Sequence, residues 1–571
     1  MSADGDVDLE IPVLIIGAGP AGLSTALMLG RMGTPCILAE RRSSVGTHPR
    51  ATGVRIRTME LFRAWGIDAE IARRALPVKN GGDVVWVHSV AGEEFGRFDI
   101  AGARDDGLQQ SATPMTEVFC PQDEVEPVLL DAVRRYPAAD VRLGTEVHDV
   151  RPRGSGATAV LVDAGGGVTR VRAEFVVACD GAGSPTRDAL GIDIAGPGPT
   201  VPSVNVEFRA DLEPYVGDHS AVIHWVLNSR TCGMLAARDG RFEWYYSVMS
   251  GAPDPADPSD SSGWVRLVRD TVGVADLPVE IEQVRHWVMD AKVSDSFRQG
   301  SVFLVGDAAH RFPPSGGFGM NSSIQDAHNL AWKLHAVLSG WAGPRLLDTY
   351  EMERRPIAEF NARQSWRNMA QMSETGIGPD ISEFARGLEA ERDNGGDQPL
   401  RAKIRRGIPL QAPHFDALGQ DIGFSYPSGA LISDGSEPPM AEDPRFVQSG
   451  APGRRAPHHY LHRNGTEIST LDLFNTSLTL LSGDQDEGWV AAARAAATVR
   501  GVALRAYRVG TDADLHDPTG TWAKTAGVGP GGACLVRPDG HVAWRTADAA
   551  DGDAHTTIGT VLDTVLSRQP D

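Results

Sequence analysis

The feature that most constrains this chain is a strand–turn–helix–strand pattern near its N-terminus. A short apolar run leads into the glycine turn GAGPAG at residues 17–22, and a helix of small residues and a second apolar run follow. Gly17 permits the tight turn, Gly19 lets a pyrophosphate approach the backbone, and Gly22 lets the helix pack closely on the strand. Glu40 ends the second run, roughly 20 residues after the turn, where a carboxylate accepts hydrogen bonds from a ribose hydroxyl. Because the start of the helix also attracts phosphates, the sequence predicts a dinucleotide-binding βαβ unit.

A second glycine run with the same spacing, residues 527–532, stands in a different context. It precedes the strand-like segment ACLV rather than a helix. Because this motif binds a pyrophosphate where a strand leads into a helix, we interpret the second copy as a loop.

Length and charge exclude several classes of protein. At 571 residues the chain is too long for one hydrophobic core, and we expect about three to four domains. The net charge of −21 opposes binding to nucleic acid or to an anionic membrane surface. No apolar run approaches the ~20 residues that span a bilayer, and the N-terminus is acidic where a signal peptide is basic. We therefore expect a cytoplasmic protein that binds neither nucleic acid nor membranes.

The five cysteines are scattered along the chain without a CxxC pair. Such spacing is typical of reduced, buried thiols rather than of a zinc site or a disulfide framework. We predict no metal site.

The apolar periodicity alternates between helical and strand-like along the chain. We predict an α/β fold in which a Rossmann-like nucleotide domain is interleaved with a β-sheet domain, followed by a separate C-terminal module. The predicted nucleotide domain comprises residues 1–80, 115–185 and 285–373, the sheet domain 81–114 and 186–284, a polar linker 374–409, and the C-terminal module 410–571.

Two further motifs follow strand-like runs. The run FVVACD leads into the segment from Asp180 to Arg187, and the run VFLVGD leads into AAHRFPPSGGFGMN, which ends at Asn321. Together with the glycine turn they resemble the class A flavin-dependent monooxygenases, the group that includes p-hydroxybenzoate hydroxylase and phenol hydroxylase. The resemblance covers most of residues 10–370. The segment STLDLF at 469–474 makes the C-terminal module similar to the thioredoxin-like extension of the aromatic polyketide hydroxylases.

The resemblance implies an enzyme that uses FAD, NADPH or NADH, and dioxygen. In that family the nicotinamide reduces the flavin, which then forms a C4a-hydroperoxide that hydroxylates an electron-rich aromatic ring. A single βαβ unit fits a family whose NADPH visits the flavin without a Rossmann domain of its own. The implied partner is a small aromatic substrate, and the implied state is a monomer or a homodimer. The C-terminal module carries only Cys534, which makes redox chemistry there improbable.

The resemblance also assigns the FAD-binding residues, which lie in the glycine turn, after the second strand, before residue 123 and in the two later motifs. They are Gly17, Gly19, Pro20, Ala21, Gly22, Glu40, Arg41, Arg50, Gln122, Asp180, Arg187, Gly306, Asp307, Pro314, Gly317, Gly319, Met320 and Asn321. The glycine-rich loop before Asn321 opens a long helix, whose N-terminus would stabilise negative charge on the pyrimidine side of reduced flavin. Two purely structural alternatives stay open: an ion pair between Asp180 and Arg187, and a cap formed by Asp307.

Catalytic roles are expected for Arg50, Pro314, His224 and Tyr246. Phenol hydroxylases carry an Asp where this chain has Thr52, which disfavours a small phenol. A larger polyphenolic ring system is favoured, because its hydroxyl groups are more acidic and need less help from a base. The candidate pocket residues, of which strand alternation predicts that half face the pocket, are Trp86, His88, His224, Trp225, Tyr245 and Tyr246. His310 is equally compatible with a scaffold role and a catalytic role.

Three other activities stay open at this point. The same scaffold supports a Baeyer–Villiger oxidation, and it supports oxidative inactivation of an antibiotic, because the outcome depends on how the substrate lies. A non-catalytic protein that keeps the dinucleotide fold is the third alternative, which the intact motifs at Asp180 and Asp307 oppose.

Overall fold

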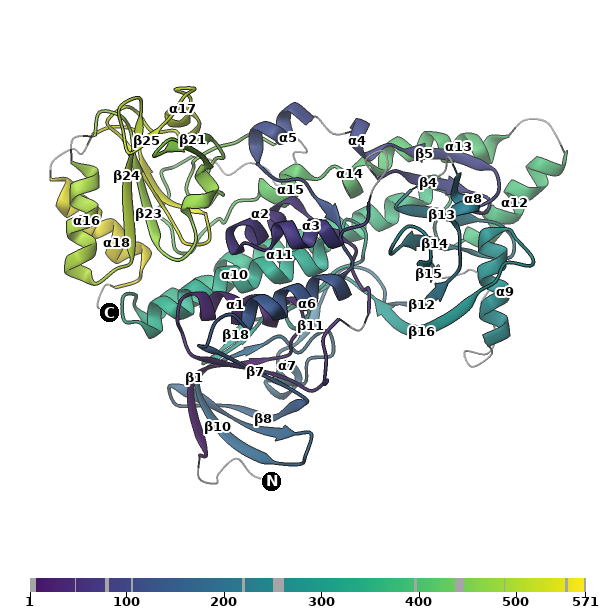
Figure 1. Cartoon of the computed structure of the whole chain (residues 1–571), viewed down its shortest axis with the longest axis horizontal. Coiled ribbons are helices and arrows are strands. Elements are labelled where there is room, and N and C mark those ends of the chain that lie inside the picture. The colour runs from purple at the N-terminus through teal and green to yellow at the C-terminus, as the bar shows by residue number, and fades with distance from the viewer. Residues whose placement is uncertain are drawn as a thin grey trace.

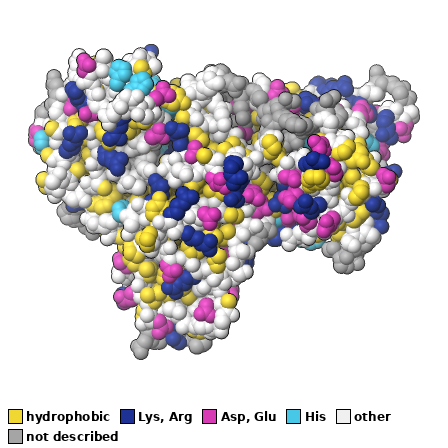
Figure 2. Space-filling model, viewed as in Figure 1, with side chains coloured by type: hydrophobic (Ala, Val, Ile, Leu, Met, Phe, Trp, Pro, Cys, Tyr) yellow, Lys and Arg dark blue, Asp and Glu magenta, His cyan; other side chains and the backbone are white. Residues whose placement is uncertain are grey.

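The computed structural model describes residues 7–46, 48–77, 82–103, 106–217, 221–249, 261–394, 398–436, 446–486, 488–549 and 553–568. Figure 1 shows three lobes: the nucleotide-domain sheet at the bottom, the sheet domain on the right and the C-terminal module at the upper left, with long helices between them. Acidic and basic side chains are interspersed over the face shown in Figure 2. Among the described residues, no helix combines the length and apolar character that crossing a bilayer requires.

The nucleotide domain is built on an eight-stranded sheet with the order β18-β19-β10-β1-β2-β7, which β9 and β8 extend from β10. Its strands are β1 (Leu9–Ile16), β2 (Cys36–Glu40), β7 (Ala139–Leu143), β8 (Thr145–Arg153), β9 (Gly156–Asp163), β10 (Val168–Ala178), β18 (Arg298–Gln299) and β19 (Val302–Leu304). β1 is parallel to both β2 and β10, and β10 is parallel to β19. The loops after β1, β10 and β19 therefore leave the same edge of the sheet, which is where ligands bind in such folds.

Helices cover this sheet and support its binding edge (Figure 1). They are α1 (Pro20–Arg31), α2 (Ile56–Trp65), α3 (Asp68–Arg74), α6 (Gln122–Val133), α10 (Phe318–Leu338) and α11 (Thr349–Gln371). α1 packs against both α6 and α10. Ten of the twelve residues of α1 are buried, because small side chains let it lie between the sheet and these two helices.

The sheet domain is a seven-stranded sheet with the order β16-β12-β15-β14-β13-β4-β5. Its strands are β4 (Val84–Val87), β5 (Glu94–Phe98), β12 (Val201–Arg209), β13 (Ile223–Leu227), β14 (Cys232–Ala237), β15 (Glu243–Val248) and β16 (Glu280–Met289). β4, from residues 81–114, pairs with β13, from residues 186–284, and β5 extends the sheet from β4, so the predicted interleaving is present. The predicted boundary at 284 is wrong, because β16 pairs with β12 as far as Met289.

The segment 374–409, predicted as a linker, instead forms helices that pack on the sheet domain. They are α12 (Ile381–Asn394) and α13 (Pro399–Gly407). Ile381, Ala385 and Leu388 are buried at i, i+4 and i+7 spacing and join the core formed by β4, β5 and β13. The many charged residues on the exposed face obscure this buried helical stripe in the sequence.

The C-terminal module has its own seven-stranded sheet, with the order β22-β21-β25-β24-β23-β26-β27. Its elements are β21 (Tyr460–Arg463), β22 (Thr466–Ser469), β23 (Leu478–Ser482), α16 (Trp489–Arg500), β24 (Leu504–Gly510), β25 (Leu515–His516), α17 (Trp522–Ala526), β26 (Ala533–Val536), β27 (Val542–Thr546) and α18 (Ala554–Val565). A parallel β23-α16-β24 unit is followed by an antiparallel β26-β27 hairpin and a helix. This is the arrangement of a thioredoxin core. The glycine run 527–532 is a loop between α17 and β26, as its context predicts.

The predicted start of this module at residue 410 is too early. Helices α14 (Ala412–Phe415) and α15 (Leu418–Ile422) precede the module's sheet. Leu418 and Ile422 pack against Ile56 of the nucleotide domain rather than inside the module.

All five cysteines are buried and unpaired. Burial raises the pKa of each, to about 12 for Cys36, Cys120, Cys232 and Cys534. Because the thiolate is the reactive form, we expect the native protein at pH 8 to react with no equivalent of a thiol reagent and the unfolded protein to react with all five. A thiol titration before and after addition of denaturant measures both values. Reaction of the native protein would show that a cysteine is accessible.

Candidate active site

The glycine turn after β1 leaves space beside one glycine and none beside the others. Gly17 has φ of +97°, and a Cβ atom there would lie 2.5 Å from the carbonyl oxygen of Cys179. A Cβ at Gly22 would lie 1.8 Å from the Gly17 oxygen, whereas a Cβ at Gly19 would meet no atom within 4 Å. Gly17 and Gly22 are therefore required by close packing. Gly19 borders open space at the N-terminus of α1, where a phosphate is stabilised.

Glu40 closes one side of this turn. Its Oε2 accepts a hydrogen bond from the amide of Ala18 at 2.8 Å, and its Oε1 accepts two from Arg42, at 3.0 and 2.9 Å. Burial opposes ionisation of Glu40, but these hydrogen bonds outweigh it and lower its pKa. The carboxylate is thus held ionised as an acceptor. The basic side chain in contact with it is Arg42, while the predicted ligand Arg41 is exposed to solvent.

The Asp180 motif binds its own loop. The Asp180 carboxylate accepts hydrogen bonds from the Ser184 hydroxyl at 2.5 Å and from the Thr186 amide at 3.0 Å. Arg187 donates instead to the carbonyl oxygens of Ala182 and Ala308, at 3.3 and 3.2 Å. Arg187 therefore ties the loop after β10 to the loop after β19, and it does not pair with Asp180.

Asp307 lies in the short 3₁₀ turn η3 (Gly306–Ala308) after β19. Burial raises the pKa of Asp307, and the charges of His310, Arg50 and Arg311 oppose the rise only in part. The predicted ligands Arg50 and Asp307 thus interact electrostatically although they come from distant parts of the chain. Next to them His310 is fully buried and contacts Asp326 at 2.6 Å, which assigns this histidine to the scaffold.

The N-terminus of α10 meets the segment before α2. Gly317 caps the helix in the left-handed conformation, with φ of +68°. The Asn321 side-chain amide donates to the carbonyl oxygens of Gly317 and Gly53, at 2.6 and 2.9 Å, and its oxygen accepts from the Arg55 amide at 3.0 Å. Asn321 therefore holds two segments together with its side chain. Pro314 is exposed on the turn that leads into the helix.

Gln122 stands at the start of α6, beside the same segment. Its backbone amide donates to the carbonyl oxygen of Ala51 at 2.7 Å, and its side chain donates to Glu126 at 2.7 Å. The remaining predicted ligands lie within elements already described: Pro20 and Ala21 at the start of α1, Gly306 at the start of η3, and Gly319 and Met320 in the first turn of α10.

Several glycines of these loops border open space. A Cβ atom would meet nothing within 4 Å at Gly19, Gly53, Gly181, Gly183, Gly317 and Gly319. A ligand at this edge could approach the backbone at these glycines, and Glu40 and Asp307 would offer carboxylates to its hydroxyl groups. These residues fit FAD.

The strand register of the sheet domain separates the candidate pocket residues. Tyr245 pairs with Glu207 across β15 and β12, whereas Tyr246 pairs with Val206, and directly paired residues share a face. The face that bears Tyr245 and Glu207, called the inward face here, meets the nucleotide domain. Burial raises the pKa of Tyr245, and the neighbouring Thr52 side chain opposes the rise. Glu207 forms an ion pair with His48.

The predicted catalytic roles of His224 and Tyr246 are corrected by this register. Both are fully buried on the opposite face, where helix α9 (Ser261–Val272) covers the sheet. The Tyr246 hydroxyl forms a hydrogen bond with Thr231 at 2.7 Å, and His224 packs edge-on against Trp244. These side chains belong to the core of the sheet domain.

The other three candidates lie on the same side as Tyr245 but near α12 and α13. Trp86 and Trp225 are buried in the core shared with these helices. His88 contacts Glu389 of α12 at 3.3 Å. Of the six candidate pocket residues, Tyr245 is thus the one whose pKa is affected by a side chain of residues 48–53. Sequence reasoning missed His48 and Glu207, because their contact depends on how two domains face each other.

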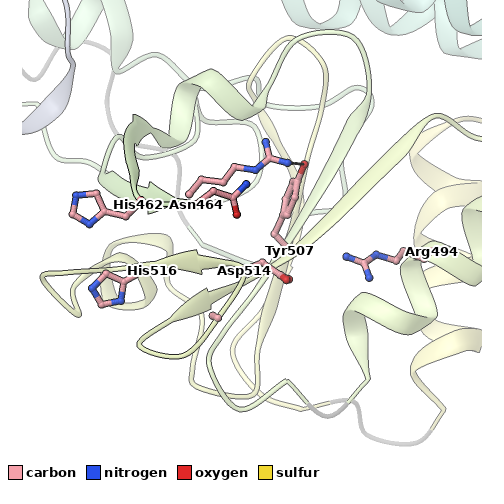
Figure 3. A pocket seen from close by; sticks show the side chains of 9 residues that line it. His462, Asn464, Arg494, Tyr507, Asp514 and His516 are labelled. Carbon is pink, nitrogen blue, oxygen red and sulfur yellow. Dashed lines mark hydrogen bonds between the residues drawn. The ribbon is translucent and has the colours of Figure 1, made fainter.

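A separate open cleft of about 640 Å³ lies in the C-terminal module (Figure 3). His462 and His516 stack on its rim with ring centroids 5.9 Å apart. Arg463 donates to the Tyr507 hydroxyl at 3.3 Å, and Arg494 donates to the carbonyl oxygen of Ala506 at 2.7 Å. This cleft shares no residue with the three loops of the dinucleotide edge. Among the described residues, no group of three His, Cys, Asp or Glu is arranged to hold a metal ion.

Comparison with known proteins finds family matches for the N-terminal and the C-terminal parts of the chain. Residues 10–365 match the family described as FAD binding domain, and residues 449–568 match the family described as aromatic-ring hydroxylase, C-terminal. A putative polyketide hydroxylase of Streptomyces halstedii is 37% identical over 575 residues, which cover 99% of this chain and 98% of that protein. Aklavinone 12-hydroxylase RdmE of Streptomyces purpurascens is 35% identical over 572 residues, which cover 98% of this chain and 100% of that protein.

The solved structure of the flavin-dependent monooxygenase PieE, in complex with FAD and substrate, superposes with a TM-score of 0.90 at 32% identity. The match covers 99% of this chain and 100% of that one. Because the family matches fall on the parts that form the dinucleotide edge and the C-terminal module, the chain belongs to the FAD-dependent aromatic-ring hydroxylases and is a flavoprotein monooxygenase similar to the polyketide hydroxylases.

Proposed function

We propose that the protein transfers one oxygen atom of dioxygen to an electron-rich polycyclic aromatic substrate of polyketide type, with NADPH or NADH as the reductant. The observation that carries this proposal is the position of segment 48–53. It lies between the dinucleotide edge and the inward face, and it contacts that face through His48–Glu207 and Thr52–Tyr245. The substrate class is supported by relatives that are named polyketide and aklavinone hydroxylases, and by Thr52 in place of an acidic residue.

The FAD would be held by the three loops and by the N-terminus of α10. Gly19 and the start of α1 would bind the pyrophosphate, Glu40 a ribose, and Asp307 a hydroxyl of the ribityl or ribose. When bound, FAD supplies the activation of dioxygen for transfer to the ring. The N–H groups at Gly319 and its neighbours would stabilise negative charge at the adjacent ring edge.

Tyr245 and Glu207 would orient the substrate and handle its phenolic proton. Burial raises the pKa of Tyr245 to about 12, so this hydroxyl stays protonated at neutral pH and acts as a hydrogen-bond donor. The carboxylate of Glu207, which contacts His48 on the inward face, would accept the phenolic proton, and the loss of that proton makes the ring more electron-rich. Both domains together exclude water from the reacting atoms.

Replacing Tyr245 by phenylalanine is expected to lower kcat/KM roughly 10-fold or more, because a preorganised donor in a dry site is lost. Tyr246→Phe is the matched control. It removes a hydroxyl of the neighbouring residue on the opposite face, and we expect it to lower the free energy of unfolding by about 1 kcal/mol while kcat/KM stays unchanged. Steady-state kinetics and urea unfolding of both variants measure these effects. Equal kinetic losses in the two variants would contradict the assignment of the inward face.

The proposed function is tested by mass spectrometry of products after the FAD-loaded protein is incubated with NADPH, heavy-isotope dioxygen and a panel of polycyclic phenols. A product that keeps its ring system and gains one heavy oxygen supports the proposal. Ring expansion to a lactone would assign a Baeyer–Villiger oxidation instead, and conversion of an added tetracycline or rifamycin would assign antibiotic inactivation. A single-ring phenol as the preferred substrate would contradict the proposed substrate class.

A further inference from the structure

The hairpin between β26 and β27, residues 537–541, carries buried charges from the C-terminal module into the FAD-binding domain. Arg537 is fully buried and donates to both oxygens of the Glu353 carboxylate on α11, at 2.7 and 2.9 Å. It also pairs with Asp539 across the turn. Lys333 of α10 donates to the same Glu353 carboxylate at 2.7 Å. Because one buried carboxylate is shared by two cations from different elements, the hairpin and the two helices fix one another's position.

The contacts continue from α11 to the turn 306–310 of the FAD site. Arg354, next to Glu353, donates to Asp326 at 2.6 Å and to the Tyr426 hydroxyl at 3.3 Å. Asp326 contacts the ring of His310 at 2.6 Å, and it accepts a hydrogen bond from the Gly306 amide at 3.4 Å. The turn that carries the proposed FAD ligand Asp307 is therefore anchored on α11 through buried ionic contacts.

The hairpin also contacts helix α2, which directly follows the segment 48–55. The carbonyl oxygen of Asp539 accepts a hydrogen bond from Arg57 at 2.7 Å. Gly540 has φ of +78°, and a Cβ there would lie 3.3 Å from the Arg57 guanidinium, so the turn packs directly on this side chain. Arg57 is in the first turn of α2, which follows the segment that contains Arg50 and Thr52. The hairpin thus contacts both α11, which anchors the turn 306–310, and α2, which follows the segment 48–55.

The charges of this network balance. The acids are Asp326, Glu353 and Asp539, and the bases are Lys333, Arg354 and Arg537, all buried. Burial alone would raise the pKa of Glu353, but Arg537 and Lys333 outweigh it and hold the pKa at about 2. Removal of one cation leaves a buried carboxylate that must move or recruit another partner, and any such movement shifts α11.

We propose that Arg537 is a positioning residue for the FAD site, and that the C-terminal module serves to hold the turn 306–310 and the segment 48–55 at the distance that FAD requires. The proposal rests on the assignment of Asp307 and Arg50 to the flavin site. It gives the module a role in cofactor binding although the module contributes no residue to the three loops.

The test measures FAD affinity of the apoprotein, by flavin fluorescence, together with the visible circular dichroism of bound flavin. Arg537→Gln is expected to weaken FAD binding about 10-fold, within the range that remote positioning residues reach, and to change the flavin dichroism. Arg537→Lys keeps the charge but cannot make all the hydrogen bonds of the guanidinium to Glu353 and Asp539, so its affinity should lie between those of the wild type and Arg537→Gln. The control is Arg500→Gln, which breaks a pair with Asp563 at 2.8 Å inside the module and should leave FAD affinity unchanged.

A milder variant decides the matter if Arg537→Gln does not fold. Tyr426→Phe removes only the hydroxyl that accepts from Arg354, and we expect a loss of FAD affinity of about 3-fold. FAD affinity within twofold of wild type in both Tyr426→Phe and a folded Arg537→Gln would overturn the proposal and leave the network a purely structural role. Because no substrate is added, a negative hydroxylation assay has no bearing on this result.

Discussion

Alanine in place of Gly19 is expected to abolish tight FAD binding without destabilising the protein. The backbone of Gly19 has φ of −75° and ψ of −177°, which alanine adopts without strain, and the added Cβ meets no protein atom within 4 Å. The Cβ would instead enter the space through which the pyrophosphate approaches the N-terminus of α1. We expect FAD affinity to fall about 100-fold, which corresponds to about 2.7 kcal/mol. The apoprotein should keep or gain stability, because alanine restricts the unfolded chain.

Gly22→Ala is the comparison that gives this prediction its meaning. The Cβ of residue 22 would lie 1.8 Å from the oxygen of Gly17, so α1 must move away from β1. We expect loss of FAD binding and of apoprotein stability together. Fluorescence titration with FAD and thermal unfolding of both apoproteins separate the two cases. Full FAD affinity in Gly19→Ala would show that the pyrophosphate does not bind at this turn.

Removing the carboxylate of Glu60 is expected to lower the free energy of unfolding by about 3–5 kcal/mol, because it leaves buried cations without a partner. Glu60 lies on α2 and accepts hydrogen bonds from Arg57 at 2.8 Å, from Arg455 at 2.9 and 2.5 Å, and from Thr113 at 2.7 Å. Burial opposes its ionisation, but the two arginines outweigh burial and lower the pKa to about 2. A lowered carboxyl pKa stabilises the fold above the ordinary value of 4.5, and this stabilisation is lost as the pH falls from 4.5 towards 2. The difference between the wild type and Glu60→Ala should thus be full at pH 7 and shrink below pH 4.5.

Glu70 supplies a strict control for that measurement. Its pKa is also lowered to about 2, by hydrogen bonds from Arg73 and Arg74, but its surroundings are open to solvent. Solvent screens such pairs, so Glu70→Ala should leave the urea midpoint unchanged. Equal losses for Glu60→Ala and Glu70→Ala would show that burial does not decide the contribution of an ion pair in this protein.

The parts of the site that follow directly from a strand could be predicted from the sequence. The positions of Gly17, Glu40, Asp180 and Asp307 depend on which strand each one follows, and parallel strands of one sheet bring their loops to one edge. Strand alternation could separate Tyr245 from Tyr246, but it could not say which of them faces the nucleotide domain.

That choice depends on tertiary packing. Helix α9 covers the face that bears Tyr246. The contact between His48 and Glu207 joins residues far apart in the chain, and no local pattern indicates it. The helices α12 and α13 were not predicted for another reason. Most residues of that segment are polar or charged, and the few buried apolar residues at helical spacing did not stand out in its composition.

The strand order of the dinucleotide sheet bears on how this protein is synthesised. β1 lies between β2 and β10, and β10 needs β19 on its other side, so the sheet is complete only when residue 304 has been made. At about 5–20 residues per second, the ribosome needs on the order of 15–60 s to reach that point. During this time the βαβ unit exists with an unpaired strand edge, which is a site for aggregation. The hairpin 537–541 is made later still, so, if it positions the FAD site as proposed, that site reaches its final geometry only after residue 541 has been made.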